Sequence, residues 1–233
     1  MISFRPVSLL LSTILLGSLP VLAQSVLAQS LLGQSIDEMA QQGLEAYQSG
    51  EYESAVAVWQ RMIELDPQNA DAYNNLGATL YQLGELDAAA EAYQQSLEID
   101  PDSAGTYNNL GTVLALQEDY EGAVAAYERA IEIDPALPEV YVNLGNLLPP
   151  EDAIIAYQRA TELKPDYAEA YNNLGTVLAN VERFEEAAAA YNRALEINPD
   201  FQAAQANLAA VEAQMEASMA PEEEAEDEAE ESP

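Results

Sequence analysis

The stretch YNNLGTVLA occurs twice in this chain, at residues 107–115 and 171–179. Close variants are YNNLGATLY at 73–81 and YVNLGNLLP at 141–149. In each of them Tyr, Leu, Gly and a further Leu recur with the spacing i, i+3, i+4 and i+7, which is typical of one buried face of a helix. A second helical pattern follows each stretch, and a proline ends it.

These prolines are Pro67, Pro101, Pro135, Pro165 and Pro199, so their spacings are 34, 34, 30 and 34 residues. A fixed period in this range predicts an array of stacked repeats. The chain resembles the tetratricopeptide repeat family in its Leu-Gly pairs and in the small residue followed by an aromatic one. The pairs are Leu76-Gly77, Leu110-Gly111, Leu144-Gly145 and Leu174-Gly175, and the others are Ala55 with Trp59, Ala89 with Tyr93, Ala123 with Tyr127, Ala153 with Tyr157 and Ala187 with Tyr191.

The resemblance implies an all-α, right-handed solenoid of five helical hairpins. The units are expected at 36–69, 70–103, 104–137, 138–167 and 168–201, followed by a capping helix at 202–219 and a disordered acidic tail at 220–233. The capping helix is expected to cover the last unit with Ala204, Leu208 and Val211. In the first unit Gln42-Gly43 replaces the Leu-Gly pair, as suits a terminal repeat with one face in solvent.

The fourth unit, 138–167, lacks four residues where the other units have a last helical turn and a loop. Pro149 disfavours helix at Leu148, and Pro150 suits the first turn of the next helix. About one turn, roughly 6 Å of helix, is therefore expected to be missing, with altered stacking of this repeat. The sequence leaves two interpretations open: a tolerated loop deletion, or a notch beside Asn143 and Asn146 that admits a partner's side chain.

The charge of the chain excludes several functions. Lys and Arg total 7 against 41 Asp and Glu, a formal net charge of −34. Nucleic-acid binding depends on basic side chains that neutralise phosphates, and docking on an anionic membrane surface has the same requirement. There is no Cys and no His, so disulfides, thiolate and imidazole catalysis and the usual zinc or haem ligands are absent. No cofactor and no metal site is expected.

The N-terminus has the pattern of a secretory signal peptide. Arg5 precedes an apolar run from Val7 to Leu19, and small residues before Gln24 suggest cleavage after Ala23, or after Ala28 where the phrase recurs. The expected signal peptide is residues 1–23 and a linker follows at 24–35. The run is short for a membrane span, although an uncleaved anchor stays open. The mature protein is therefore expected to be exported, either periplasmic or secreted.

One position of the repeat holds asparagine in four successive units. The resemblance implies that the first helix of each unit lines a concave groove, so these asparagines are expected to form a ladder along it. A side-chain amide offers a donor and an acceptor, and such a row can hold the backbone of an extended peptide. Bracing of neighbouring helices is the alternative. The asparagine ladder is Asn75, Asn109, Asn143 and Asn173, doubled one residue earlier by Asn74, Asn108 and Asn172, with Asn146 and Tyr81 as further groove candidates.

The ligand is expected to be a neutral or basic peptide. The first helices carry no Lys or Arg, so the clamping of a C-terminal carboxylate known in the family is not carried over. Four acids occupy the second position of four units, where the helix dipole favours them and where they make the groove edge negative. These acids are Asp37, Asp71, Glu139 and Glu169. On the second helices Arg61, Arg129, Arg159 and Arg193 each precede a Glu by three residues, which predicts ion pairs on a solvated convex face.

These features predict a non-enzymatic interaction scaffold that binds an extended segment of a protein partner. An enzyme would need two carboxylates converging in one cleft, whereas the acids here recur at equivalent repeat positions. The alternative places the function in the acidic surface and tail, which would bind basic partners or weakly sequester divalent cations. No nucleic acid and no membrane beyond the signal peptide is expected as a partner, and the oligomeric state stays open.

Overall fold

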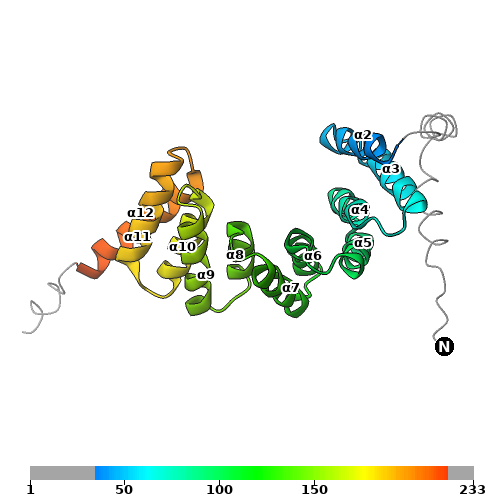
Figure 1. Cartoon of the computed structure of the whole chain (residues 1–233). Helices are drawn as coiled ribbons and strands as arrows, with labels where there is room; N and C mark the ends of the chain where they lie inside the picture. The colour runs from blue at the N-terminus through cyan, green and yellow to red at the C-terminus, as the bar shows by residue number, and fades with distance from the viewer. Residues whose placement is uncertain (1–34, 220–233) are drawn as a thin grey trace, which may run out of the picture. The chain divides into compact units, whose positions relative to one another are not determined.

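The computed structural model describes residues 35–219, and the regular structure in that range is entirely α-helical (Figure 1). The expected signal peptide, most of the linker and the acidic tail lie outside the described residues. The predicted all-α solenoid of five hairpins and a final helix is confirmed. The hairpins are α2 (Ile36–Gln48) with α3 (Tyr52–Leu65), α4 (Ala70–Gln82) with α5 (Leu86–Ile99), α6 (Ala104–Leu116) with α7 (Tyr120–Ile133), α8 (Pro138–Gly145) with α9 (Pro150–Leu163) and α10 (Ala168–Asn180) with α11 (Phe184–Ile197), followed by α12 (Gln202–Met219).

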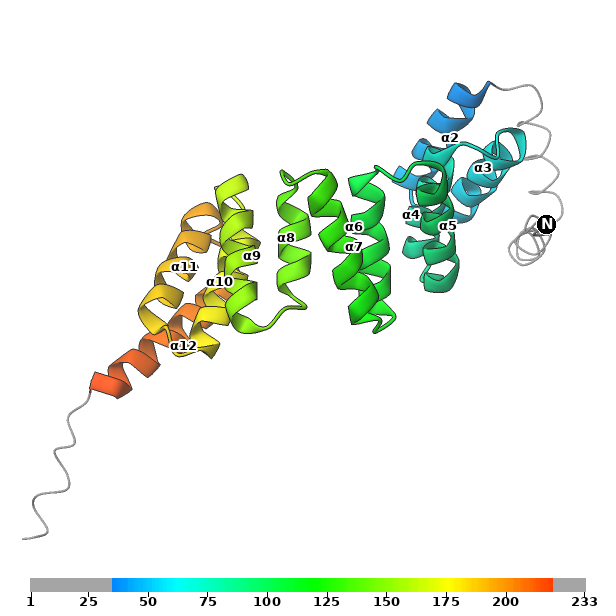
Figure 2. The same cartoon turned by 60° about the horizontal axis from the view of Figure 1, so that its bottom comes forward.

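The helices form two compact units, α2 to α7 and α8 to α12. Within the first unit α3 packs on α4 and α5 packs on α6, so each hairpin stacks on the next one. Within the second unit α9 packs on α10, and α12 packs on α11 and α10 (Figure 2). Each unit has its own hydrophobic core, built around Trp59 and Tyr93 in the first and around Tyr157 and Tyr191 in the second.

Every hairpin is closed by an aromatic ring lying on a glycine. The rings are between 1 % and 5 % exposed, and a Cβ on the facing glycine would lie 2.6 to 2.9 Å from the nearest ring atom. Real side chains do not tolerate so short a contact, so only glycine lets the two helices approach this closely. The pairs are Gly43 with Trp59, Gly77 with Tyr93, Gly111 with Tyr127, Gly145 with Tyr157 and Gly175 with Tyr191. The first hairpin, α2 and α3, therefore keeps the contact of ring and glycine although it lacks the Leu before its glycine.

In two hairpins the hydroxyl of the buried tyrosine donates a hydrogen bond to a threonine of the first helix. Tyr127 donates from its hydroxyl to Thr112 Oγ1 at 3.2 Å, and Tyr191 donates to Thr176 Oγ1 at the same distance. Both threonines directly follow the glycine that the ring covers. Because a buried hydroxyl without a partner is costly, the threonine after the glycine stabilises these two hairpins. The arrangement is not general, since Leu44 follows Gly43 and Ala78 follows Gly77.

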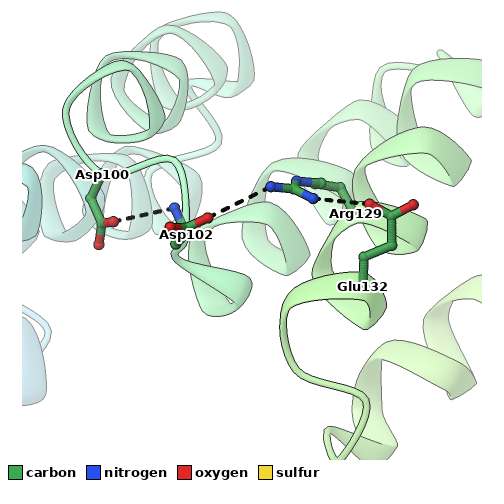
Figure 3. A network of polar contacts seen from close by, with 4 residues as sticks. All are labelled: Asp100, Asp102, Arg129 and Glu132. Carbon is green, nitrogen blue, oxygen red and sulfur yellow. Dashed lines mark hydrogen bonds and ion pairs between the residues drawn. The ribbon is translucent and has the colours of Figure 1, made fainter.

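An Asx turn follows the second helix at four of the five connections, at Asp66, Asp100, Asp134 and Asn198, whereas Lys164 follows α9. After α5, the backbone N–H of Asp102 donates to Asp100 Oδ1 at 3.2 Å, a bond that lets a short polar side chain replace a backbone turn (Figure 3). Asp102 also lies 3.6 Å from the guanidinium of Arg129, which pairs with Glu132 at 2.9 Å. The same i, i+3 ion pair occurs at Arg61, Arg159 and Arg193, as predicted. These pairs are exposed and contribute little to stability.

The fourth hairpin is shortened in its first helix. α8 has 8 residues against 13 in α6, so slightly more than the expected one turn is missing. Asn146 caps the end of α8, and the chain reaches Pro150, the first residue of α9, without the left-handed residue that closes the turn of the other four hairpins. The expected change in the stacking of this repeat on the preceding hairpin concerns the junction of the two units and stays a prediction.

The last helix covers the fifth hairpin as expected. Ala204 and Val211 of α12 are buried and Leu208 is half-buried against the second core. The other side of α12 is exposed and consists mainly of Gln, Glu and Ala, so the array ends on a face without large apolar side chains. Within residues 35–219, no helix is long and apolar enough to cross a membrane.

We predict that Gly111→Ala lowers the free energy of unfolding by about 1–3 kcal/mol, because the new Cβ would lie 2.7 Å from the ring of Tyr127. Gly105 lies in the same helix with nothing within 4 Å of such a Cβ. Gly105→Ala should therefore raise the free energy of unfolding, by up to about 1 kcal/mol. Urea unfolding followed by circular dichroism measures both, and equal effects would show that the ring does not restrict residue 111.

The hairpin turns give a second prediction. Gly50 and Gly84 adopt positive φ values of 75° and 77°, but Glu118 and Glu182 adopt 64° and 62° at the same place in their hairpins. A side chain in this region costs roughly 1–2 kcal/mol. Replacing either Glu with Gly should raise the unfolding free energy by about 1 kcal/mol, allowing for the entropy of the extra glycine. Thermal unfolding tests this, with Glu118→Ala as the control that removes the charge and keeps the Cβ. A gain with Ala as large as with Gly would assign the effect to charge.

Candidate functional site

The predicted groove asparagines lie on first helices at the boundary between core and solvent. Asn74 and Asn75 belong to α4, Asn108 and Asn109 to α6, Asn143 to α8, and Asn172 and Asn173 to α10; all seven are half-buried. Asn146 is exposed at the end of α8. These amides therefore lie at the surface of the first helices, where they border solvent and do not enter the core.

In the first unit an amide links two successive first helices. Asn109 of α6 donates from Nδ2 to Asn74 Oδ1 of α4 at 3.3 Å. Thr106 donates to the same oxygen at 3.2 Å, so this carboxamide oxygen accepts two hydrogen bonds. The side chain of Asn75 makes no hydrogen bond to any residue that the structure describes, and Asn108 has contacts of its own.

In the second unit the amides form a continuous chain of hydrogen bonds. Asn207 of α12 donates to Asn172 Oδ1 at 3.1 Å, and Asn172 donates to Asn173 Oδ1 at 3.3 Å. Asn173 then donates to Asn146 Oδ1 at 3.4 Å. Each amide donates an N–H to the oxygen of the next one, so the series of hydrogen bonds runs in one direction, from α12 through α10 to the end of α8.

These hydrogen bonds give both members of the doublet Asn172 and Asn173 a bracing role, and one member of the doublets in α4 and α6. The first member of a doublet accepts from the following first helix, as Asn74 and Asn172 do, and the second member donates to the preceding one, as Asn109 and Asn173 do. The bracing role that the sequence left open is therefore observed. Peptide binding stays a prediction, because an amide has two N–H groups and two lone pairs and these braces occupy only part of them.

Asn207 is a member of this set that sequence reasoning missed. It lies 34 residues after Asn173, at the position where a sixth unit would carry its ladder residue. The apolar pattern of α12 indicated a cap, but the repeat spacing, extended by one period, would have found the asparagine as well.

Tyr81 is half-buried and packs against the first core. Burial raises the pKa of Tyr93, and the nearby phenols of Tyr47 and Tyr81 raise it further. Tyr47 also meets the ring of Tyr52 edge-on, with centroids 5.6 Å apart. Tyr81 thus belongs to a group of tyrosines packed between helices, and a contact with a ligand stays a prediction.

The acids predicted at the groove edge are exposed in the first turns of their helices, at Asp37, Asp71, Glu139 and Glu169. The helices that carry the asparagines, α4, α6, α8 and α10, contain no Lys or Arg, although α6 also has no acid in its first turn. Within each unit a ligand on the first helices would meet amides near negative charge, from Asp71 in the first and from Glu139 and Glu169 in the second, which suits a neutral or basic chain.

A hollow of about 320 Å³ opens where the last turn of α8 is missing. It lies between the end of α8, the start of α9 and the middle of α10, all in the second unit. Its lining residues are Gly145, Asn146, Leu148, Pro150, Ala153, Tyr157, Asn173, Thr176, Val177 and Asn180. Tyr157 donates from its hydroxyl to Asn146 Oδ1 at 2.7 Å, and burial raises the pKa of this phenol, which keeps it protonated as a donor. The notch that the sequence suggested is therefore present as a cavity, with Asn146 in its lining but not Asn143. This cavity is called the notch below.

The repeats match known families along most of the described range. Residues 43–84, 113–148 and 151–181 match a family described as TPR repeat. Residues 70–103, 168–201 and 92–125 match families described as tetratricopeptide repeat. The chain belongs to the tetratricopeptide repeat (TPR) family. TPR proteins bind protein partners and are non-catalytic scaffolds, which confirms the prediction that this TPR protein is not an enzyme.

Solved structures share the fold. The crystal structure of MamA has 25 % sequence identity and a TM-score of 0.63, and the match covers 67 % of this chain and 94 % of MamA. Pseudomonas aeruginosa pilF has 22 % identity and a TM-score of 0.67, covering 79 % of this chain and 91 % of that one. YrrB, described as a TPR protein with an unusual peptide-binding site, has 24 % identity and a TM-score of 0.62, covering 77 % and 94 %. No curated protein matches the chain.

The braces give a third prediction, which uses two adjacent asparagines of one helix. Asn74→Ala should lower the free energy of unfolding by roughly 1 kcal/mol more than Asn75→Ala, because only Asn74 links α4 to α6. The gain in helix propensity from Asn to Ala is the same in both and cancels. In a double-mutant cycle Asn74 and Asn109 should couple, whereas Asn75 and Asn109 should be additive. Additivity of Asn74 and Asn109 in chemical unfolding would contradict the brace.

Proposed function

We propose that this TPR protein is an exported scaffold that binds an extended segment of a partner protein along the first helices of its hairpins. The observation that carries the proposal is the recurrence of half-buried amides at one position of adjacent first helices, with hydrogen-bonding capacity beyond what the braces use. Peptide backbone repeats its N–H and C=O groups regularly, so a regular row of donors and acceptors is matched to it. The fold shared with YrrB is compatible with such a use, since YrrB has a peptide-binding site.

The charge pattern favours a neutral or basic segment. Four of the five described first helices present an acid in the first turn, and none of the five carries a cation. The chain as a whole has a formal net charge of −34. An acidic segment would be repelled on approach, whereas a basic one would be attracted at low ionic strength. Association with a basic partner should therefore weaken as salt is added.

Export is part of the proposal and rests on the N-terminal sequence alone. Arg5, the apolar run after it and the small residues before Gln24 are the pattern of a signal peptide. The partner would then be met in the periplasm or outside the cell.

The alternative assigns binding to the acidic surface together with the acidic tail, 220–233. The tail is rich in Glu and its partner would be basic or a divalent cation. Within residues 35–219 no group of three or more acidic side chains is arranged to hold a metal ion.

The fourth prediction is that a pull-down from the extracytoplasmic fraction of the source cell recovers a protein partner through the asparagine ladder. The bait is the chain from Gln24 onward. The ladder variant carries Asn75→Ala, Asn109→Ala, Asn143→Ala and Asn173→Ala and should lose the partner, because the donors and acceptors that match a peptide backbone are gone. Circular dichroism checks that both baits are folded.

Two further baits complete this experiment. Gly111→Ala is a destabilised control with every ladder amide intact, so it should keep the partner that the ladder variant loses. Deletion of residues 221–233 should also leave binding unchanged. Loss of the partner on tail deletion alone would establish the alternative, and equal recovery by all four baits would place the site away from the first helices.

A further inference from the structure

The notch in the second unit is the end point of the oriented hydrogen-bond chain. Asn146 Oδ1 accepts from Tyr157 at 2.7 Å and from Asn173 at 3.4 Å. These two donors identify the oxygen of the carboxamide and occupy both of its lone pairs. Neither of the two N–H groups of Asn146 has an acceptor among residues 35–219. Since Asn146 is exposed and lines the notch, its donors border this hollow.

Asn146 occupies the position that threonine holds in two other hairpins. Thr112 follows Gly111 and Thr176 follows Gly175 just as Asn146 follows Gly145, and each accepts the hydroxyl of its hairpin's tyrosine. Threonine is therefore sufficient to hold the tyrosine. Asparagine at this position adds two N–H donors, and it occurs in the described hairpin whose first helix ends one residue earlier, at Gly145.

The notch also offers acceptors. Tyr157 uses its hydrogen on Asn146, so its oxygen keeps lone pairs, and Asn173 Oδ1 accepts only one hydrogen bond, from Asn172. Leu148, Pro150 and Val177 supply apolar wall. None of the lining residues is charged. A cationic side chain would find no carboxylate here, and a carboxylate would find no cation.

A carboxamide matches this arrangement, because it is neutral and has a carbonyl oxygen and an N–H₂ group at one end. We propose that the notch binds the side chain of a glutamine from the partner segment. Its carbonyl oxygen accepts from Asn146, its N–H₂ donates to the oxygens of Tyr157 and Asn173, and its two methylenes lie on the apolar wall. A volume of about 320 Å³ is at the small end of ligand pockets and suits one side chain. The inference rests on the proposed function, because it names a residue of the segment that the scaffold would hold.

The fifth prediction is tested by nuclear magnetic resonance on the ¹⁵N-labelled chain from Gln24 onward. The probe is N-acetyl-glutamine methylamide, with the N-acetyl methylamides of methionine and glutamate as matched probes. Methionine has similar length without the amide, and glutamate has similar shape with a charge. The side-chain N–H₂ signals of Asn146 and Asn173 should shift and saturate with the glutamine probe. The methionine and glutamate probes should bind more weakly, with dissociation constants larger by roughly fivefold or more. This is the ratio expected from the loss of one hydrogen bond.

The matched variant is Asn146→Thr, which restores the residue found in two other hairpins and keeps an acceptor for Tyr157. It should bind the glutamine probe no better than the methionine probe. Thr112→Asn places the same side chain in α6, whose last turn is present, and should create no new site. The comparison of the three probes on the parent chain stands by itself if either variant fails to fold.

Equal affinity for the three probes, or an Asn146→Thr variant that keeps the preference, would overturn the glutamine site. That result would leave a partner recovered through the asparagine ladder unaffected. Conversely, preferential binding of the glutamine probe by the parent chain with no ladder-dependent partner in the pull-down would support the notch and contradict the wider scaffold proposal.

Discussion

The contact of a buried aromatic ring with a glycine is the constraint on which the rest of this structure depends. A Cβ at any of the five glycines would lie within 2.6 to 2.9 Å of a ring, so each hairpin closes only because that atom is missing. In three hairpins the ring is a tyrosine whose hydroxyl donates to the residue that follows the glycine: Thr112, Asn146 or Thr176. In these hairpins a polar side chain on the first helix is thereby tied to the packing of the core.

The asparagines connect this packing to function. A doublet can accept from one neighbouring helix and donate to the other, so amides that border solvent also hold successive hairpins together. Hydrogen bonds in such a chain polarise one another, and the last member keeps donors that no described residue takes. In the second unit that member is Asn146, because α8 ends there. In the proposed glutamine site, the shortened repeat thus lets the end of a bracing network contact a ligand.

Much of the fold followed from periodicity. The i, i+3, i+4, i+7 stripes gave the helices, the proline spacing gave the hairpins, and the Arg–Glu pairs appeared at their predicted spacing. For the candidate site, the positions of the asparagines were predicted, but not their pairings. Which amide meets which depends on the distance and rotation between helices 34 residues apart, and sequence spacing within one helix contains no information on either. Asn207 was missed because its helix was interpreted only as a cap.

The sequence by itself determined the repeat, its all-helical hairpins, the acidic charge and the position of the deletion, since all of these are properties of residue order and composition. The tertiary structure decided that Asn74, Asn109, Asn172 and Asn173 brace neighbouring helices, that the deletion opens a cavity, and that Asn146 takes the place of a threonine as the acceptor for a buried tyrosine. The reason is that hydrogen bonds and cavities arise between helices. Their geometry is set when side chains pack in three dimensions, with the ring-on-glycine contact fixing how close the two helices of each hairpin come.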